Sequence, residues 1–320
     1  MKVPRIRIAC LPTPVETLPR LSAKLGDVRL LVKRDDLTGL AFGGNKTRKL
    51  EFCLAEAQAN GARCLITVGA AQSNHCRQTA ALAARMGFNC ILVLTGDEYQ
   101  VPSGNLLLDE MFGAEIVWCK REEREQTLKN TFQAAWEAGK RPYLIPLGAS
   151  NARGALGYVN AFQELWAQDV RPDWMIVPSS SAGTQAGLVL GARLTGYKGK
   201  VLGISIDEEE SELKLRVAEI SNQAADVMGE DVRLTPTEIL VNADYLGAGY
   251  GIMGAPEQEA IHLFAQLEGL LLDPVYTGRA AAGMIDLIRG GFFKPGEQVL
   301  FWHTGGTPAL FANVYAKDLV

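Results

Sequence analysis

Short β-type apolar runs alternate with longer stretches of helical periodicity along most of this chain. Several runs are continuously apolar rather than alternating, which is typical of parallel strands that helices cover on both faces. The order of elements therefore predicts an α/β fold with doubly wound sheets. Strands are expected at 29–33, 64–68, 90–95, 115–118, 143–145, 174–177, 201–205 and 298–302.

Caps and glycine stops mark where the intervening helices begin and end. The charged stretch 120–125 predicts the start of a solvent-exposed helix rather than a functional site. Three further helices are expected to run from Asn45 as N-cap to Gly61, from near Asn74 to Gly87, and from Ser103 to Gly113.

Composition and charge exclude several classes of protein. The 320 residues are 48% hydrophobic, which is ample for a folded core. The 36 acidic residues outnumber the 32 basic ones, whereas a general nucleic-acid binder carries the opposite balance. Apolar runs such as 90–94 are far shorter than the roughly 20 residues of a membrane span. With no apolar leader visible at its N-terminus, the chain is expected to be cytoplasmic, without nucleic-acid or membrane partners.

Cysteine and histidine usage argues against a disulfide framework and against a metal site. The 6 cysteines contain no CxxC pair, and the 3 histidines form no HExxH motif. We therefore expect no bound metal.

Four predicted strand-to-helix turns are rich in Gly, Ser, Thr and Asn. In open α/β sheets, ligands bind beyond the carboxyl ends of the strands, where such turns converge. A ligand site is therefore expected at these turns. The four turns are residues 43–46, 72–75, 179–184 and 303–307.

The first of these turns presents a lysine directly after two glycines. The segment 39–47 reads GLAFGGNKT and approaches a phosphate-binding P-loop, but Asn45 breaks the required spacing. One interpretation is a glycine-rich helix entry with a surface lysine. The other is functional, because a lysine in a desolvated pocket loses its proton and attacks carbonyl groups as an amine. That is the chemistry of a Schiff-base lysine, and Lys46 is its candidate.

The other turns allow both a structural and a functional reading. Residues 179–184 either cap a helix or bind a cofactor monophosphate at its N-terminus. Asn74 either caps its helix or offers its amide to a ring hydroxyl. Tyr276 either packs half-buried or stacks on a planar ligand, and His75 receives no role.

Together these segments resemble the fold-type-II pyridoxal-phosphate (PLP) enzymes, the tryptophan-synthase-β-like family. Within that family the chain is similar to the branch of D-cysteine desulfhydrase and 1-aminocyclopropane-1-carboxylate (ACC) deaminase. The matching segments keep the family's order along nearly the whole chain. They are LPTP at 11–14, KRDD at 33–36, GGNK at 43–46, QSN at 72–74, SAGT at 181–184, GYG at 249–251, LDPVYT at 272–277 and HTGG at 303–306.

The resemblance implies a role for each matched residue around the cofactor. Lys46 would form the Schiff base with PLP and later serve as acid and base. Asn74 would donate to the ring 3′ oxygen, and Tyr276 would stack on the pyridine ring. The phosphate would be held by Ser181, Ala182, Gly183 and Thr184, with Lys49 nearby.

Further matched residues bear on the substrate and the reaction. Ser73 and Tyr250 would face a small amino-acid substrate. ACC deaminases carry glutamate and leucine where this chain has Thr277 and Thr304, which would lie near the pyridine nitrogen. A hydroxyl there gives a weaker electron sink than a carboxylate, and a weaker sink suffices when the leaving group is a thiolate. The threonines therefore favour β-elimination over opening of a cyclopropane.

The resemblance thus implies a D-cysteine desulfhydrase-like carbon–sulfur lyase that forms pyruvate, sulfide and ammonia. L-cysteate sulfo-lyase, then ACC deaminase, and a non-catalytic protein that binds PLP or amino acids remain alternatives. A homodimer is implied as well. Residues 1–54 and 158–320 are expected to form a larger domain and 55–157 a smaller one, with PLP between them.

Overall fold

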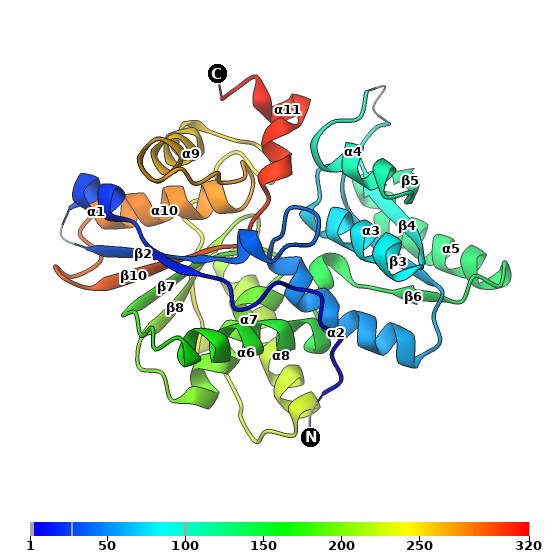
Figure 1. The fold of residues 1–320 in the computed structure, drawn as a ribbon, viewed down its shortest axis with the longest axis horizontal. Coiled ribbons are helices and arrows are strands. Elements are labelled where there is room, and N and C mark those ends of the chain that lie inside the picture. Colours follow the sequence, from blue (N-terminus) through cyan, green and yellow to red (C-terminus); the bar gives the residue numbers. More distant parts are fainter. Residues whose placement is uncertain (1–2, 27, 99–100, 320) are drawn as a thin grey trace.

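Two β-sheets organise the residues that the computed structural model describes, which are 3–26, 28–98 and 101–319 (Figure 1). The larger sheet has six strands in the order β1-β2-β10-β7-β8-β9, and the smaller has four in the order β5-β4-β3-β6. Neighbouring strands are parallel except for β1 and β2. The predicted α/β class with doubly wound sheets is therefore confirmed, with an antiparallel strand at one edge.

The predicted strands all occur, with bounds shifted by one or two residues. The larger sheet comprises β1 (Val15–Thr17), β2 (Arg29–Arg34), β7 (Trp174–Ser179), β8 (Lys200–Ser205), β9 (Leu240–Asn242) and β10 (Gln298–His303). The smaller comprises β3 (Cys64–Ala70), β4 (Asn89–Thr95), β5 (Glu115–Cys119) and β6 (Pro142–Leu144). Strands β1 and β9 were not expected, because three residues are too few to show a period.

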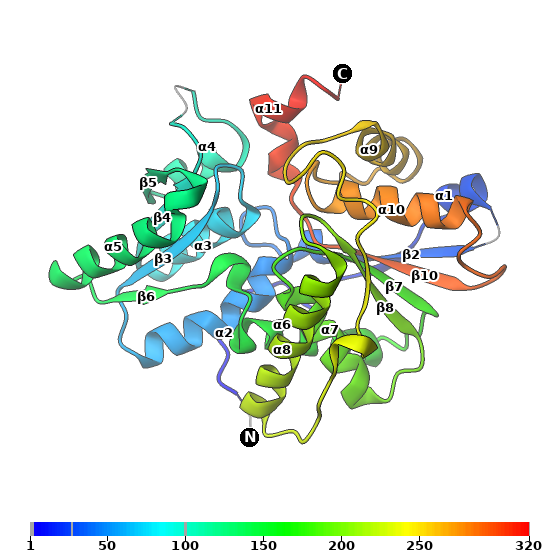
Figure 2. The same ribbon diagram turned by 180° about the vertical axis from the view of Figure 1, so that it is seen from behind.

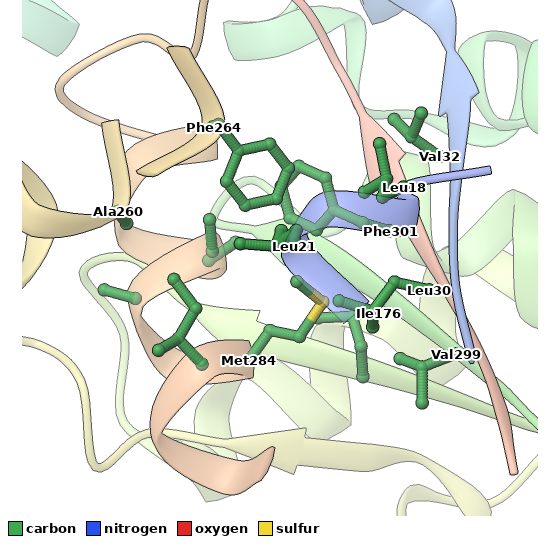
Figure 3. Packing of buried hydrophobic residues seen from close by; sticks show 14 of the residues in the cluster. Leu18, Leu21, Leu30, Val32, Ile176, Ala260, Phe264, Met284, Val299 and Phe301 are labelled. Carbon is green, nitrogen blue, oxygen red and sulfur yellow. The ribbon is translucent and has the colours of Figure 1, made fainter. Parts of the chain in front are cut away.

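Helices cover both faces of the larger sheet (Figures 1 and 2). On one face, Leu21, Phe264 and Met284 pack over Ile176 and Phe301 of the sheet (Figure 3). That face carries α1 (Pro19–Leu25), α9 (Ala255–Glu268) and α10 (Thr277–Arg289). The other carries α6 (Ala152–Ala167), α7 (Gly183–Thr195) and α8 (Glu210–Met228). Burial on both faces explains why β7 is buried along its whole length.

The smaller sheet is covered in the same way. Leu54 and Leu82 pack with Leu65 on one face, while Ala135 packs with Ile66 on the other. The first face carries α2 (Asn45–Ala59), α3 (Asn74–Met86) and α4 (Gly104–Met111), and the second carries α5 (Arg124–Glu137). The short α11 (Asn313–Ala316) follows β10. Within residues 3–26, 28–98 and 101–319, every helix is too short or too polar to cross a lipid bilayer.

The N-cap of α2 differs from the prediction, and at α3 the cap is a residue other than Asn74. Helix α2 begins at Asn45 with Gly44 as its N-cap, so the prediction of Asn45 as the cap was wrong. The Asn45 side chain instead donates to Thr184 Oγ1 at 2.9 Å. At α3, the cap is Ser73, whose hydroxyl accepts from the Cys76 N–H at 3.2 Å. The amides of Asn45 and Asn74 therefore cap neither helix and can make other contacts.

Candidate active site

A cavity lies where turns that follow strands of both sheets meet. Most of the predicted site residues line it, and strand ends supply most of its wall, as expected for an α/β fold. Those that line it are Lys46, Ser73, Asn74, Ser181, Ala182, Thr184, Tyr250, Tyr276 and Thr304. Lys49, Gly183 and Thr277 do not form part of its lining.

Two glycines bring Lys46 to the cavity. Gly43 and Gly44 have φ of 63° and 122°, values that favour glycine. A Cβ on Gly43 would lie 2.0 Å from the Asp36 carbonyl oxygen, and one on Gly44 would lie 3.0 Å from that of Thr304. The glycines therefore let α2 begin against the loop after β10, where the Asn45 N–H donates to the Thr304 oxygen at 3.0 Å. This contact sets Lys46 in the first turn of α2, facing the cavity.

The Lys46 amine is poised to lose its proton. Burial lowers the pKa of Lys46 to about 8, and the nearby Asp273 carboxylate opposes this shift only in part. Lys49, one turn further along α2, is fully buried and donates to Ser150 Oγ at 2.8 Å. Burial, and then the Lys46 charge, lower the pKa of Lys49 well below its ordinary value.

The start of α7 offers groups that suit a phosphate. Its N-cap is Ala182, with φ of 69° and no side-chain cap, and a helix N-terminus without a side-chain cap suits an anion. The hydroxyls of Ser181 and Ser150 lie 2.8 Å apart beside it. A Cβ on Gly183 would lie 2.8 Å from Lys49 Nζ, so the absence of a side chain at 183 leaves the lysine room at this helix end. Lys49 and Gly183 thus lie behind the residues that line the cavity.

Two tyrosines form another part of the lining. The hydroxyls of Tyr250 and Tyr276 lie 2.6 Å apart, and their rings meet edge to face with centroids 6.0 Å apart. Burial raises the pKa of both phenols, so both stay protonated at neutral pH. The pair can therefore donate a hydrogen bond to a ligand while it keeps its mutual contact.

The structure does not bring Thr277 to the cavity. Thr277 is fully buried at the start of α10, and its hydroxyl donates to Asp273 Oδ1 while accepting from the Asp273 N–H, both at 2.7 Å. A hydroxyl has one hydrogen to donate, and the Asp273 carboxylate takes it. Thr304 does line the cavity. Of the two threonines expected at a ring nitrogen, only Thr304 is exposed to a ligand in the cavity.

Three charged lining residues were missed by the sequence reasoning. Arg121 and Arg124 line the cavity, although the stretch 120–125 was expected only to begin an exposed helix. That stretch does lead into α5, which begins at Arg124, but it also lies at the cavity mouth. Asp207 lines the cavity as well, two residues after β8. Its place just beyond a strand end was a signal that could have identified it.

Comparison with known proteins identifies the family. Residues 6–305 match the family described as "Pyridoxal-phosphate dependent enzyme". The chain belongs to this family. It is 42% identical over 320 residues to D-cysteine desulfhydrase from Klebsiella pneumoniae (strain 342), covering 97% of this chain and 96% of that protein.

Solved structures of PLP-dependent enzymes agree with the fold. The crystal structure of an ACC deaminase homologue superposes with a TM-score of 0.90 at 37% identity, covering 99% of this chain and 96% of that one. A fungal L-serine ammonia-lyase from Rhizomucor miehei superposes with a TM-score of 0.68 at 19% identity, covering 97% of each chain. The second likeness concerns the fold alone. The chain therefore has the fold of a fold-type-II PLP enzyme.

The groups around the cavity fit this cofactor. An amine of lowered pKa suits its carbonyl group, and an uncapped helix N-terminus beside two serine hydroxyls suits its phosphate. The Asn74 amide lies at the cavity with its oxygen already bonded to Arg77 and Asn105, which leaves its NH₂ group for a ring oxygen. PLP is the cofactor of this family member.

Proposed function

We propose that the chain is a D-cysteine desulfhydrase, a PLP-dependent carbon–sulfur lyase. The observation that carries the proposal is a single cavity lined by Lys46, Asn74 and Thr184, in a chain 42% identical to a D-cysteine desulfhydrase. The reaction converts D-cysteine and water to pyruvate, sulfide and ammonia. Of the two threonines expected at the ring nitrogen, Thr304 lines the cavity, and a hydroxyl there supports elimination of a thiolate over opening of a cyclopropane.

The chain's own residues bind the substrate and move its protons. When bound, PLP supplies an electron sink for the bond broken at the substrate Cα. Lys46 Nζ, whose pKa is lowered by burial to about 8, removes the proton from Cα. The Ser73 hydroxyl and the start of α3 hold the substrate carboxylate. The Tyr250 and Tyr276 hydroxyls are both protonated and share one hydrogen bond, so the pair has one hydrogen left to donate towards the leaving sulfur.

The cofactor contacts form part of the same proposal. Lys46 carries the cofactor, and Asn74 binds its ring oxygen. Tyr276 packs on the ring. Thr304 donates a hydrogen bond to the ring nitrogen, because the Thr277 hydroxyl already donates to Asp273. The phosphate is bound by Ser181, Ala182, Gly183 and Thr184, with Lys49 as its charge partner.

A substrate panel tests the proposed reaction. The purified enzyme is assayed with D-cysteine, L-cysteine, L-cysteate and ACC, and sulfide, sulfite, pyruvate and 2-oxobutyrate are measured. We expect equal amounts of sulfide and pyruvate, with the highest kcat/KM for D-cysteine. Formation of 2-oxobutyrate from ACC at a higher kcat/KM would overturn the assignment, and so would an absence of turnover in PLP-loaded protein.

A second candidate, L-cysteate sulfo-lyase, is favoured by the arginines at the cavity. Arg121 and Arg124 line the cavity mouth, where a guanidinium suits a sulfonate through charge-assisted hydrogen bonds. Arg124→Gln is therefore expected to weaken L-cysteate binding about tenfold, as a KM or an inhibition constant, and to change the KM for D-cysteine less than about twofold. Equal effects on both ligands would exclude a sulfonate-specific contact.

Attachment of the cofactor is expected to follow the titration of Lys46. Only the neutral amine attacks a carbonyl, and burial lowers the pKa of Lys46 to about 8. The rate at which PLP attaches to apoenzyme should therefore rise about tenfold between about pH 7 and about pH 9 and then level off. Borohydride trapping at successive times measures the rate, with a free alkylamine as control. A rate that keeps rising with pH like the alkylamine's would contradict the lowered pKa.

We also propose the domain division expected from the sequence, and its assembly. Residues 1–54 and 158–320 form the larger domain and 55–157 the smaller. All four strands of the smaller sheet, β3 to β6, fall within 55–157, which supports this division. We propose a cytoplasmic homodimer acting on a small amino acid. Light scattering on the purified enzyme tests the dimer.

A further inference from the structure

Arg77 lies directly behind Asn74, on the side away from the cavity. It is fully buried on α3, three residues after Asn74. Its Nη1 donates to Asn74 Oδ1 at 3.0 Å and to Asn105 Oδ1 at 2.7 Å. Its Nη2 donates to the Gly43 carbonyl oxygen at 2.9 Å. One guanidinium therefore joins Asn74, the start of α4 and the glycine turn that precedes Lys46.

The charge of this guanidinium is not neutralised by a hydrogen-bonded carboxylate. The acceptors that Arg77 contacts are two amide oxygens and one carbonyl oxygen. The Asp109 carboxylate acts on it only through space, and both Asp109 oxygens lack a hydrogen-bond partner within the described part of the chain. Burial lowers the pKa of Arg77 to about 10, which still leaves it charged at neutral pH. A full positive charge thus acts on the oxygen of Asn74.

Arg77 also decides which way two side-chain amides point. A guanidinium has donors and no acceptor, so Asn74 and Asn105 must both turn their oxygens towards it. The Asn105 Nδ2 then donates to Asn74 Oδ1 at 2.9 Å and to the Gln72 carbonyl oxygen at 2.8 Å. With its oxygen doubly engaged, Asn74 has its NH₂ group left for the cavity. Gly306 keeps this group accessible, because a Cβ there would lie 2.7 Å from Asn74 Nδ2.

We propose that Arg77 is a positioning residue, supported by Asn105, that fixes the Asn74 amide as a polarised hydrogen-bond donor to the ring oxygen of the cofactor. The inference rests on the proposed role of Asn74. Two donors on an amide oxygen, one of them charged, draw electrons from the amide and strengthen its N–H groups as donors. A stronger donor stabilises the ionised form of the ring oxygen.

The consequence is measurable in the absorbance of the bound cofactor. With an ionised ring oxygen the cofactor attached to lysine absorbs in the visible range, and with a protonated one it absorbs in the near ultraviolet. Arg77→Gln removes the charge and the donor that fixes the amide. In the PLP-loaded enzyme it should raise the ratio of near-ultraviolet to visible absorbance about fivefold at fixed pH. Arg77→Lys keeps the charge without the fork of donors, so its ratio should lie between the two.

Gln78 provides a matched control on the same helix. It is also fully buried, and its side chain also donates to the Gly43 carbonyl oxygen, but none of its hydrogen bonds reaches Asn74. Gln78→Leu therefore loosens the glycine turn to a similar extent without releasing the amide. Its absorbance ratio should stay at the wild-type value.

A second variant covers the case in which Arg77→Gln fails to fold. Asn105→Asp keeps an acceptor for Arg77, removes one donor to Asn74 and neutralises the guanidinium, so it should raise the ratio as well. Thermal melts and borohydride-fixed PLP establish folding and loading for each protein. An unchanged ratio in a folded, loaded Arg77→Gln or Asn105→Asp enzyme overturns the proposal, as does an equal rise in Gln78→Leu. Failure of the wild type to carry PLP on Lys46 would instead overturn the proposed function.

Discussion

Lys46→Ala is expected to lower turnover of D-cysteine at least about 1000-fold and to abolish the visible absorbance of the purified enzyme. The loss is large because one amine both carries the cofactor and moves the Cα proton, and each role alone is worth orders of magnitude in rate. Lys46 is the lysine that lines the cavity, with burial lowering its pKa to about 8. Steady-state kinetics and an absorbance spectrum measure both effects.

Lys49→Gln is the matched control for this variant. Lys49 lies one turn further along α2 and bonds to Ser150 behind the cavity wall. The Lys49→Gln enzyme should keep the visible band and lose affinity for PLP. If Lys46→Ala kept the visible band, or if Lys49→Gln lost it while folded and supplied with PLP, the assignment of Lys46 would be wrong.

Asp35→Ala is expected to lower the free energy of unfolding by about 3–5 kcal/mol, because it removes the buried carboxylate that Arg48, Tyr158 and Trp302 all contact and leaves Arg48 with Glu164 as its remaining ion-pair partner. Asp35 is fully buried and pairs with Arg48 at 2.7 Å. It also accepts from the hydroxyl of Tyr158 at 2.6 Å and from the indole N–H of Trp302 at 2.8 Å. The Asp35 carboxylate, which directly follows β2, thus contacts side chains of α2, α6 and β10.

Chemical denaturation of the variant and the wild type measures this loss. Glu259→Gln breaks the exposed pair with Arg289 and should change stability by less than about 1 kcal/mol. Burial acts to raise the pKa of Asp35, but the Arg48 charge holds it below its ordinary value. A lowered pKa means that the contribution is present at neutral pH and is lost as pH falls into the acid range. A loss below about 1 kcal/mol for Asp35→Ala would show that the buried pair is not needed.

The sequence predicted the elements whose signals are local. Strands such as β3 and β7 are mostly apolar, and their bounds match to within two residues. Strands β1 and β9 have three residues each, which is too few to show a period, and neither was expected from the sequence. The cap of α2 was misassigned because glycine, which lacks a side chain, occupies the position where a polar residue was sought.

The site was predictable where it depends on strand ends and not where it depends on packing. Lys46, Asn74 and Thr184 each follow a turn beyond a strand, and the sheets bring those turns to one cavity. Thr277 does not line the cavity, and its hydroxyl hydrogen is taken by Asp273, four residues earlier. Arg124 was missed because only the fold carries that charged stretch to the cavity mouth. A motif fixes neighbours along the chain but not the direction of a side chain.

The most direct test of the account is to locate the lysine that carries the cofactor. The enzyme as purified with PLP is reduced with borohydride, digested and analysed by peptide mass spectrometry. The account predicts that the pyridoxyl phosphate mass lies on Lys46, in the peptide that begins α2. Modification of Lys49 or of a lysine outside the cavity, with Lys46 unmodified, would contradict it.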